Sequence, residues 1–338
     1  MSPAAYMLIF ILGVAVVVFT GFPAFLFKVL ALGLMLGTLL VFLKKEFLLL
    51  SVALLLFLSG MLRGTLGPLP LPFLEPVSGR LETVRDSFVR HIAAILPEPQ
   101  SSFIAGLLVG GKSLLPRDLK TALGRTGTSH IVALSGYNVT IIANYISLIF
   151  RSPVFSIVAI LTFVLATGAS SSVVRAGIMG SVFFLSERYG TFYKAKDALL
   201  FAVLLMVFVH PDIMAEDIGF QLSVLATMGL LYLTRVITPY LSFIPECFNL
   251  KKIAGETLAA EAATLPLVLF YFGFFSPFAP LVNLLILPLI PATMLFGFIA
   301  GLGAYAHNLF GIFLAWPAYL LTRWELGLIQ FFANIHVF

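Results

Sequence analysis

The chain has 338 residues, of which 60% are hydrophobic and only 10% are charged, and its mean hydropathy is +1.09. This composition excludes an ordinary soluble domain and indicates a membrane protein. The formal net charge of +5 is modest. The single cysteine, Cys247, excludes an intrachain disulfide framework and any metal site built from several cysteines.

Apolar runs of membrane-spanning length follow one another along the chain. Tyr6–Thr20, Phe25–Leu43 and Phe47–Leu62 approach the roughly 20 apolar residues that cross a bilayer core of about 30 Å. No Lys or Arg precedes the first run, so we do not expect it to be a cleaved signal peptide. Further spans are expected over residues 130–150, 152–168, 172–187, 196–211, 217–237, 254–275, 279–300 and 305–333, the last as one helix or two pieces.

The fold class that follows is an all-α polytopic membrane protein with about 10–11 transmembrane helices. Several spans are expected to be broken or half-length, at Ser135-Gly136, at the Ser170–Ser172 triplet, at Pro266, and at Pro288 with Pro291. We expect three segments: N-terminal transmembrane helices over residues 1–62, an extracytoplasmic segment over residues 63–128, and a transmembrane domain over residues 129–338.

Basic residues indicate the orientation of these spans. Lys and Arg cluster between alternate spans, and the bias of these residues toward cytoplasmic loops places the amino terminus inside and the segment from Arg63 to Ser129 outside. The inside cluster comprises Lys44, Lys45, Arg151, Arg188, Lys194, Lys196, Arg235, Lys251 and Lys252.

Within the outside segment, apolar residues recur at steps of three and four, which predicts an amphipathic helix. Its apolar face comprises Leu81, Val84, Phe88, Ile92 and Ile95. Two alternatives are open: the helix lies in the membrane interface, or it packs on the membrane bundle.

Polar side chains interrupt the apolar stretch from Gly127 to Ile142. His130, Ser135, Gly136 and Asn138 lie at a depth where hydrocarbon offers no water to satisfy them. Polar groups in such places face a bundle interior or a water-filled path, and they are the first candidates for a functional site.

Arg175 is the most informative single residue, because a guanidinium inside a membrane helix costs on the order of 2.5–3.5 kcal/mol on insertion scales. It lies about one turn after Ser171 or Ser172, either of which is a suitable N-cap. Backbone N–H groups at a helix amino terminus, together with Arg175, would form an anion site. The alternatives are that Arg175 reaches the outer interface or pairs with Glu256 or Glu261.

A wider set of polar residues extends this candidate path. Glu256 and Glu261 are five residues apart, about 140° around a helix, so they do not share one face. Glu261 is either a partner for Arg175 or a group facing the lumen. Gln221, Ser223 and Asn283 complete the set, although each alone is more often a helix–helix hydrogen bond.

Catalysis is not expected. Ser135 has no nucleophile-elbow motif around it, and the five histidines show no zinc-protease spacing. Gly106–Ser113 matches the phosphate-loop pattern, but no strand precedes it and Pro116 follows closely. We therefore predict a protein that is not an enzyme and that has no metal site and no cofactor.

Four segments together resemble the competence proteins of the ComEC type, over roughly Gly106 to Leu295. They read GTSHIVALSGYNV, SSVVRAGIM, GFQLSVLATMGLL and TLPLVLFYFGFFSPFAPLVNLLILP. The resemblance implies an inner-membrane channel that passes single-stranded DNA into the bacterial cytoplasm during transformation. His130, Ser135, Gly136, Tyr137, Asn138, Arg175, Gln221, Ser223, Glu261 and Asn283 would then line the DNA path.

The sequence departs from the family pattern in ways that bear on its partners. Asn138 stands where the family commonly has His, so a titratable group is not expected there. Residues 63–98 are too short for the OB-like domain of longer members, and the sequence stops at Phe338, before a metallo-β-lactamase-like domain. The resemblance therefore implies a separate DNA receptor and a separate nuclease.

Electrostatics adds a further partner and leaves two other functions open. A polyanion that enters an inside-negative cell moves against about 2.3 kcal/mol per charge per 100 mV, so we expect a cytoplasmic ATPase or DNA-binding partner. One alternative is a secondary transporter of a small anionic or polar solute, with Arg175 as its anchor and Glu261 as a proton-coupled carboxylate. The other is an intramembrane hydrolase built on His130 and Ser135.

Overall fold

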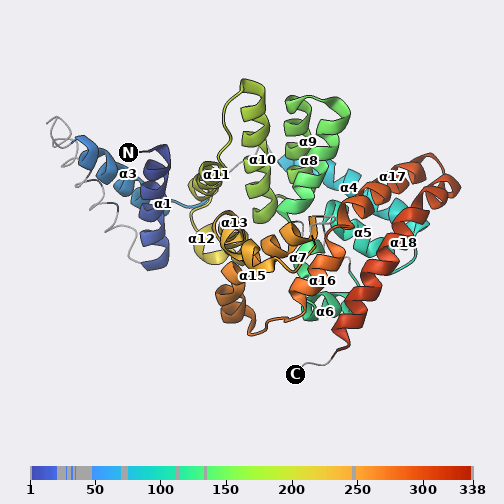
Figure 1. The fold of residues 1–338 in the computed structure, drawn as a ribbon. Coiled ribbons are helices and arrows are strands. Elements are labelled where there is room, and N and C mark those ends of the chain that lie inside the picture. The colour runs from blue at the N-terminus through green and yellow to red at the C-terminus, as the bar shows by residue number, and fades with distance from the viewer. Residues whose placement is uncertain are drawn as a thin grey trace. The chain divides into compact units, whose positions relative to one another are not determined.

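The structure is a computed structural model that describes residues 2–20, 28, 32, 35, 48–69, 75–110, 115–132, 135–245 and 249–335. Throughout these ranges the regular elements are helices and none is a strand (Figure 1). This confirms the prediction of an all-α polytopic membrane protein. The expected span over Phe25–Leu43 and the single Cys247 lie outside the described residues.

The long apolar helices follow the expected spans, whereas the short helices α5, α6, α7 and α12 were not expected from the sequence. Their bounds are α1 (Pro3–Thr20), α3 (Leu48–Gly64), α4 (Glu75–Ile95), α5 (Gln100–Val109), α6 (Arg117–Arg125), α7 (Ser129–Val132), α8 (Gly136–Phe150), α9 (Pro153–Ala166), α10 (Ser171–Tyr189), α11 (Ala195–Val209), α12 (Ile213–Glu216), α13 (Ile218–Tyr232), α14 (Thr234–Ile237), the 3₁₀-helix η4 (Thr238–Leu241), α15 (Leu250–Phe272), α16 (Ala279–Ile286), α17 (Ile290–Ala306) and α18 (Asn308–Ala333).

Two of these helices, α1 and α15, are by length and composition apolar enough to cross a membrane, and up to four spans result if two bent pairs each count as one. The pairs are α13 with the segment Thr234–Leu241, bent by 43°, and α16 with α17, bent by 52°. The second bend lies at Pro288, as expected. The expected break at Pro266 was wrong, because α15 continues through that proline, and α18 is one helix.

The chain forms two compact units, Met1–Pro72 with Leu185–Val224, and Phe73–Phe184 with Leu225–Phe338. These units cut across the three segments expected from the sequence. The physical reason is that α11, which follows in the chain long after α1 and α3, packs against α1.

In the first unit, α1 and α3 pack at glycines. A Cβ atom on Gly13 or on Gly60 would collide with the backbone of the facing helix, so the two helices approach as closely as small residues allow in membrane proteins. Arg63, near the end of α3, joins this helix to the end of α11. Its guanidinium donates to the carbonyls of Phe208 and Val209 at the end of α11 and lies 5.5 Å from the Phe208 ring centroid, so it satisfies carbonyls that a helix end leaves open.

The second unit has its main core among helices far apart in the chain. Buried apolar side chains from α4, α5, α6, α7, α8, α16, α17 and α18 form one cluster. A second cluster joins α8, α9 and α10, which lie side by side in Figure 1. Gly177 of α10 lies against Val164 of α9 there. These two clusters fix α8 between the α9–α10 pair and the rest of the unit.

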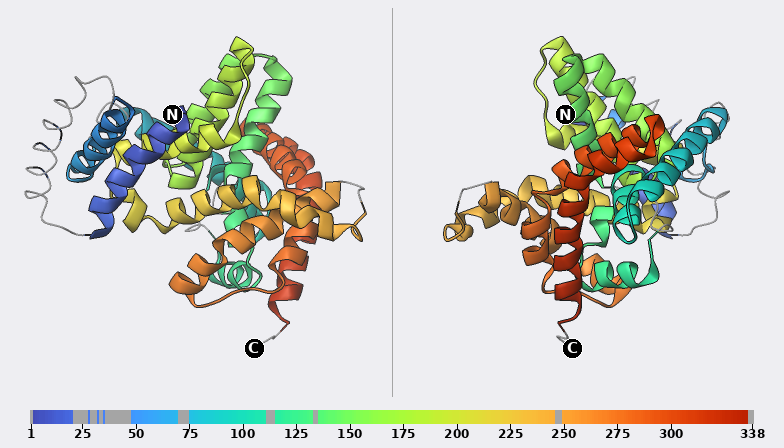
Figure 2. Two further views of the ribbon diagram at one scale, coloured as in Figure 1. Left: turned by 60° about the vertical axis from the view of Figure 1, so that its left-hand side comes forward. Right: turned by 90° about the vertical axis from the view of Figure 1, so that its right-hand side faces the viewer.

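Helices α17 and α18 pack side by side as a hairpin (Figure 2). Two glycines of α17 receive side chains of other helices: Gly297 receives Ile104 of α5, and Gly301 receives Phe88 and Ile92 of α4. Phe88 and Ile92 are buried, whereas Val84 is 62% exposed. The carboxyl-terminal half of the amphipathic helix therefore packs on the bundle, whereas Val84 in its amino-terminal half is exposed.

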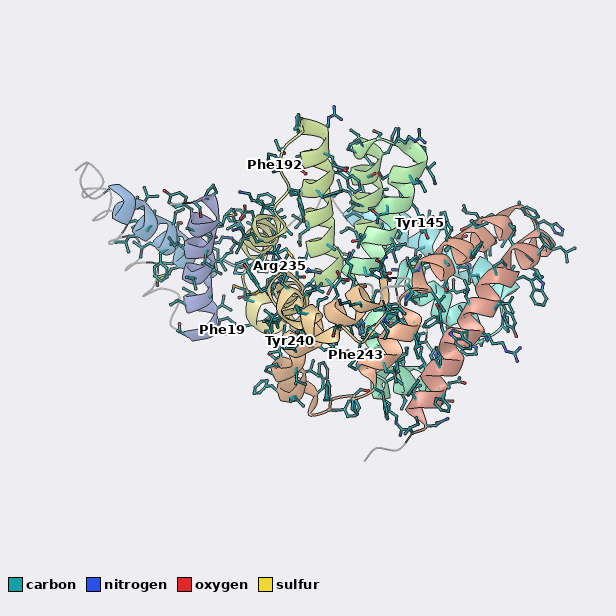
Figure 3. The ribbon with its side chains drawn as sticks, in the orientation of Figure 1. Phe19, Tyr145, Phe192, Arg235, Tyr240 and Phe243 are labelled. Carbon is teal, nitrogen blue, oxygen red and sulfur yellow. The ribbon has the colours of Figure 1, made fainter. Side chains whose placement is uncertain are left out.

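Large aromatic side chains project from the surface of the protein. Phe19, Phe192, Tyr240 and Phe243 extend away from the ribbon in Figure 3, and Phe192 is 97% exposed. A soluble protein rarely exposes so many large apolar groups, whereas a membrane protein presents them to lipid and to the interface.

The α4–α17 contact predicts opposite effects for two glycine substitutions. A Cβ atom on Gly301 would lie 2.5 Å from the Phe88 ring, whereas one on Gly327 of α18 would meet nothing within 4 Å. We expect Gly301→Ala to destabilise the purified protein by about 1–3 kcal/mol through overpacking. We expect Gly327→Ala to stabilise it by about 0.5–1 kcal/mol through helix propensity. Thermal unfolding in detergent measures both, and equal shifts would contradict this packing.

Candidate functional site

The amino terminus of α8 lies at the expected break in the polar stretch. Ser135 precedes the helix in an extended conformation, and Gly136 is its first residue. No side chain caps this end. The Ser135 hydroxyl instead donates to Oδ1 of Asn138, 3.2 Å away. The first amides of α8 therefore keep the partial positive charge of a helix amino terminus.

Arg175 reaches this helix end from α10. The amides of Val173 and Val174 bond to the carbonyl of Ser170, so Arg175 lies about one turn into its helix, as expected. The residue is only 8% exposed. Its Nη2 atom lies 3.0 Å from the position that a Cβ atom on Gly136 would occupy. Its Nε atom is buried and has no hydrogen-bond partner.

The carboxylates that could have neutralised Arg175 have other partners. Glu256 lies 3.9 Å from Lys252 on its own helix. Glu261 accepts a hydrogen bond from Nδ2 of Asn283, 3.3 Å away. The alternative in which Arg175 pairs with either glutamate is therefore wrong. As expected, the two glutamates face different surroundings.

Asn138 fixes the start of α8 in place. Its side chain is fully buried. Its Nδ2 atom donates to the carbonyl of Leu107 in α5 at 3.0 Å and to that of Ile131 in α7 at 3.4 Å. An amide used in this way holds three helices together and positions the helix end that Arg175 faces. Whether Asn138 also lines a path stays a prediction.

Two tyrosines of α8 bind the break between α16 and α17. The hydroxyl of Tyr137 donates to the carbonyl of Leu287 at 3.3 Å, and that of Tyr145 donates to the carbonyl of Pro291 at 3.0 Å; Tyr145 is labelled in Figure 3. In a continuous helix the Leu287 carbonyl would accept from residue 291, but proline has no N–H. The Tyr137 hydroxyl replaces the missing donor, so α8 stabilises the break between α16 and α17.

The Glu261–Asn283 pair joins α15 to α16. Asn283 is almost fully buried, and its Oδ1 atom has no hydrogen-bond partner. An unsatisfied buried oxygen costs free energy, which marks this pair as a polar feature that packing alone does not explain.

Other predicted residues have hydrogen-bond partners close to them in the chain. Nδ1 of His130 lies 3.0 Å from the carbonyl oxygen of Gly127. Gln221 and Ser223 belong to the first compact unit. The Gln221 amide donates there to the carbonyls of Met214 and Ala215, and Ser223 is buried. The structure thus brings Gly136, Tyr137, Asn138 and Arg175 together around the start of α8.

Sequence reasoning missed one buried carboxyl group, that of Glu325 in α18. Glu325 has no exposed surface. Its Oε1 atom accepts a hydrogen bond from Thr293 of α17 at 2.8 Å, and its Oε2 atom has no partner. The available signal was a lone acidic residue between Trp324 and Leu326 in an apolar run.

Across the described ranges, no group of three or more His, Cys, Asp or Glu side chains could hold a metal ion. The candidate groups are instead an uncapped helix end, one buried arginine whose Nε atom has no hydrogen-bond partner, and two carboxyl groups that each accept a hydrogen bond from a neutral side chain. Polar groups inside the bundle of a membrane protein are candidates for a functional site.

Comparison with known proteins identifies the family. A family model described as "Competence protein" matches residues 107–338, and the chain belongs to this family. ComE operon protein 3 of Bacillus subtilis (strain 168) is 24% identical to the chain over 266 residues, which is 76% of the chain but 33% of that relative. The matched region therefore spans about a third of the relative's length. No solved structure matches.

The buried hydrogen bond between Thr293 and Glu325 predicts that replacing Thr293 destabilises the protein more than replacing Thr322, a second buried threonine. The Thr322 hydroxyl bonds only to carbonyls of its own helix, Ala318 and Tyr319. We expect Thr293→Val to destabilise the protein by about 1–3 kcal/mol, because it leaves the Glu325 carboxyl without a partner, and Thr322→Val to be nearly neutral. Thermal unfolding in detergent compares them; equal losses would argue against a structural role for the bond.

Proposed function

We propose that the protein passes single-stranded DNA across the bacterial cytoplasmic membrane during natural transformation. Membership in the competence family supports a role in DNA uptake. The observation that carries the proposal is Arg175, a buried cation of the matched region whose Nε atom has no hydrogen-bond partner among the described residues. A buried charge is costly unless something pairs with it, and a translocated phosphate would do so.

Two further buried polar groups in the second unit support a hydrated path over a purely structural bundle. Asn283 and Glu325 each keep an oxygen without a hydrogen-bond partner. Water or a polar solute would satisfy such groups. Arg175 is the anion contact of the proposed path, and the role of the other residues expected from the sequence stays a prediction.

The same proposal extends to location and orientation. A protein that handles incoming DNA in this way lies in the cytoplasmic membrane with many spans. The distribution of Lys and Arg supports an amino terminus inside the cell.

We also propose that other chains supply the remaining steps. DNA capture and degradation of the second strand would need a separate receptor and nuclease. Inward movement of a polyanion opposes the membrane potential by about 2.3 kcal/mol per charge per 100 mV, so a cytoplasmic ATPase would supply the energy. The protein itself would act without catalysis.

Charge reversal at Arg175 tests the proposed function. In a transformable host that carries this chain in place of its own homologue, we expect Arg175→Glu to lower uptake of labelled DNA by about tenfold or more, since it replaces attraction with repulsion. Arg323→Gln is the control, because Arg323 is exposed on α18.

Membrane abundance of each variant is measured beside uptake. Normal uptake at normal abundance in Arg175→Glu would refute the proposal. Loss of uptake of a small anion, with DNA uptake intact, would assign the protein to solute transport instead.

A further inference from the structure

We infer that the amino terminus of α8 and the guanidinium of Arg175 together form a binding site for one phosphodiester group. This goes beyond the proposed passage of DNA by naming the chemical group bound and the atoms that bind it, and its biological ligand rests on that proposed function. The site belongs wholly to the second compact unit.

The helix end supplies the first half of the site. Gly136 and Tyr137 open a helix of 15 residues, and helix geometry gives their amides no acceptor within the helix. The amides of Asn138 and Val139 instead turn toward the carbonyl of Ser135. Since no side chain caps this end, an external anion is the partner that its N–H groups and dipole favour.

Arg175 supplies the second half, and its placement is independent of the helix end. The side chain is more than nine-tenths buried, its Nε atom has no partner, and its Nη2 atom points at Gly136. A cation held against the positive end of a helix is repelled by it. Both groups are therefore unfavourable to folding when the site is empty, and both are neutralised by one anion between them.

Gly136 shows how closely the site is built. A Cβ atom at this position would lie 3.0 Å from Nη2 of Arg175 and 3.2 Å from Cβ of Ala176. The glycine thus leaves room for the guanidinium to reach the helix backbone. Ser135 and Gly136 are partly exposed, and Tyr137 is 42% exposed, so a ligand can reach the helix end although Arg175 itself is buried.

The charge of the site selects the ligand class. One guanidinium and about half a charge from a helix end match a singly charged phosphodiester. The binding groups are backbone amides and an arginine fork, which recognise phosphate oxygens and carry no information about base sequence. Asn138 holds the helix start to α5 and α7, so the donors are preorganised.

The test measures binding of a fluorescent oligothymidylate to the purified full chain in detergent, with dimethyl phosphate as a competitor that has no base. We expect Arg175→Gln to weaken oligonucleotide binding by about tenfold or more. We expect Gly136→Ala to weaken it by a similar factor, because the methyl group displaces the guanidinium.

Two matched controls separate the site from general effects of charge and packing. Arg323→Gln removes an exposed arginine. Gly180 lies in α10, the helix of Arg175, and Gly180→Ala places a Cβ atom 3.1 Å from Cδ1 of Ile160 in α9. This contact is nearly as close as the 3.0 Å contact that a Cβ atom on Gly136 would make. Both variants are expected to bind as the unsubstituted protein does.

Thermal unfolding without ligand distinguishes a binding role from a structural one. Arg175→Gln is expected to unfold at the same temperature or higher, because it removes a buried charge that has no partner. If the variant unfolds at a clearly lower temperature and binds the oligonucleotide normally, Arg175 is structural and the inference is overturned.

The results also separate this inference from the proposed function. Weakened binding in both site variants, with DNA uptake unaffected in cells, would support the phosphate site and refute the proposed passage of DNA. Unchanged binding in both variants, with DNA uptake lost, would overturn the phosphate site and leave the proposed function standing.

Discussion

The start of α8 depends on one constraint, which is that polar groups in an apolar chain must be satisfied inside the protein. Hydrocarbon cannot hydrogen-bond to them. Each such group therefore bonds to another part of the protein or is available to a ligand. Asn138 joins helices, with its amide divided between the carbonyls of Leu107 and Ile131. Arg175 does not, since its Nε atom has no partner. Asn138 therefore has a structural role, whereas Arg175 is the candidate for binding a ligand.

Helix α8 contacts both Arg175 and the bend between α16 and α17. Its first residues face Arg175, and its tyrosines reach the carbonyls of Leu287 and Pro291 at the bend between α16 and α17. Proline makes the bend by removing an amide donor, and a tyrosine from another helix replaces that donor. Helix α8 therefore connects the surroundings of Arg175 to the bend through two hydrogen bonds.

Membership in the competence family is consistent with this arrangement, because the matched region, residues 107–338, contains α8, α10 and the bent pair. Helix α4 precedes that region, yet Phe88 and Ile92 insert beside Gly301 of α17. The segment outside the family match thus completes the packing of the matched region, and the fold of this unit depends on both.

The sequence by itself determined the helical class, the approximate bounds of the long apolar helices, and the residues worth attention. Hydrophobic runs and polar interruptions are local properties, so they can be read without knowing what packs against what. The same is true of Arg175 and of the stretch around Gly136, whose residue types are unusual for their surroundings.

Tertiary structure alone decided which of those residues meet. It paired Glu261 with Asn283 and left Nε of Arg175 without a partner among the described residues. It kept α15 continuous through Pro266 and buried Glu325 against Thr293. Hydrogen-bond partners come from helices distant in the chain, and the choice among several plausible partners depends on helix rotation and approach, which composition and periodicity do not encode.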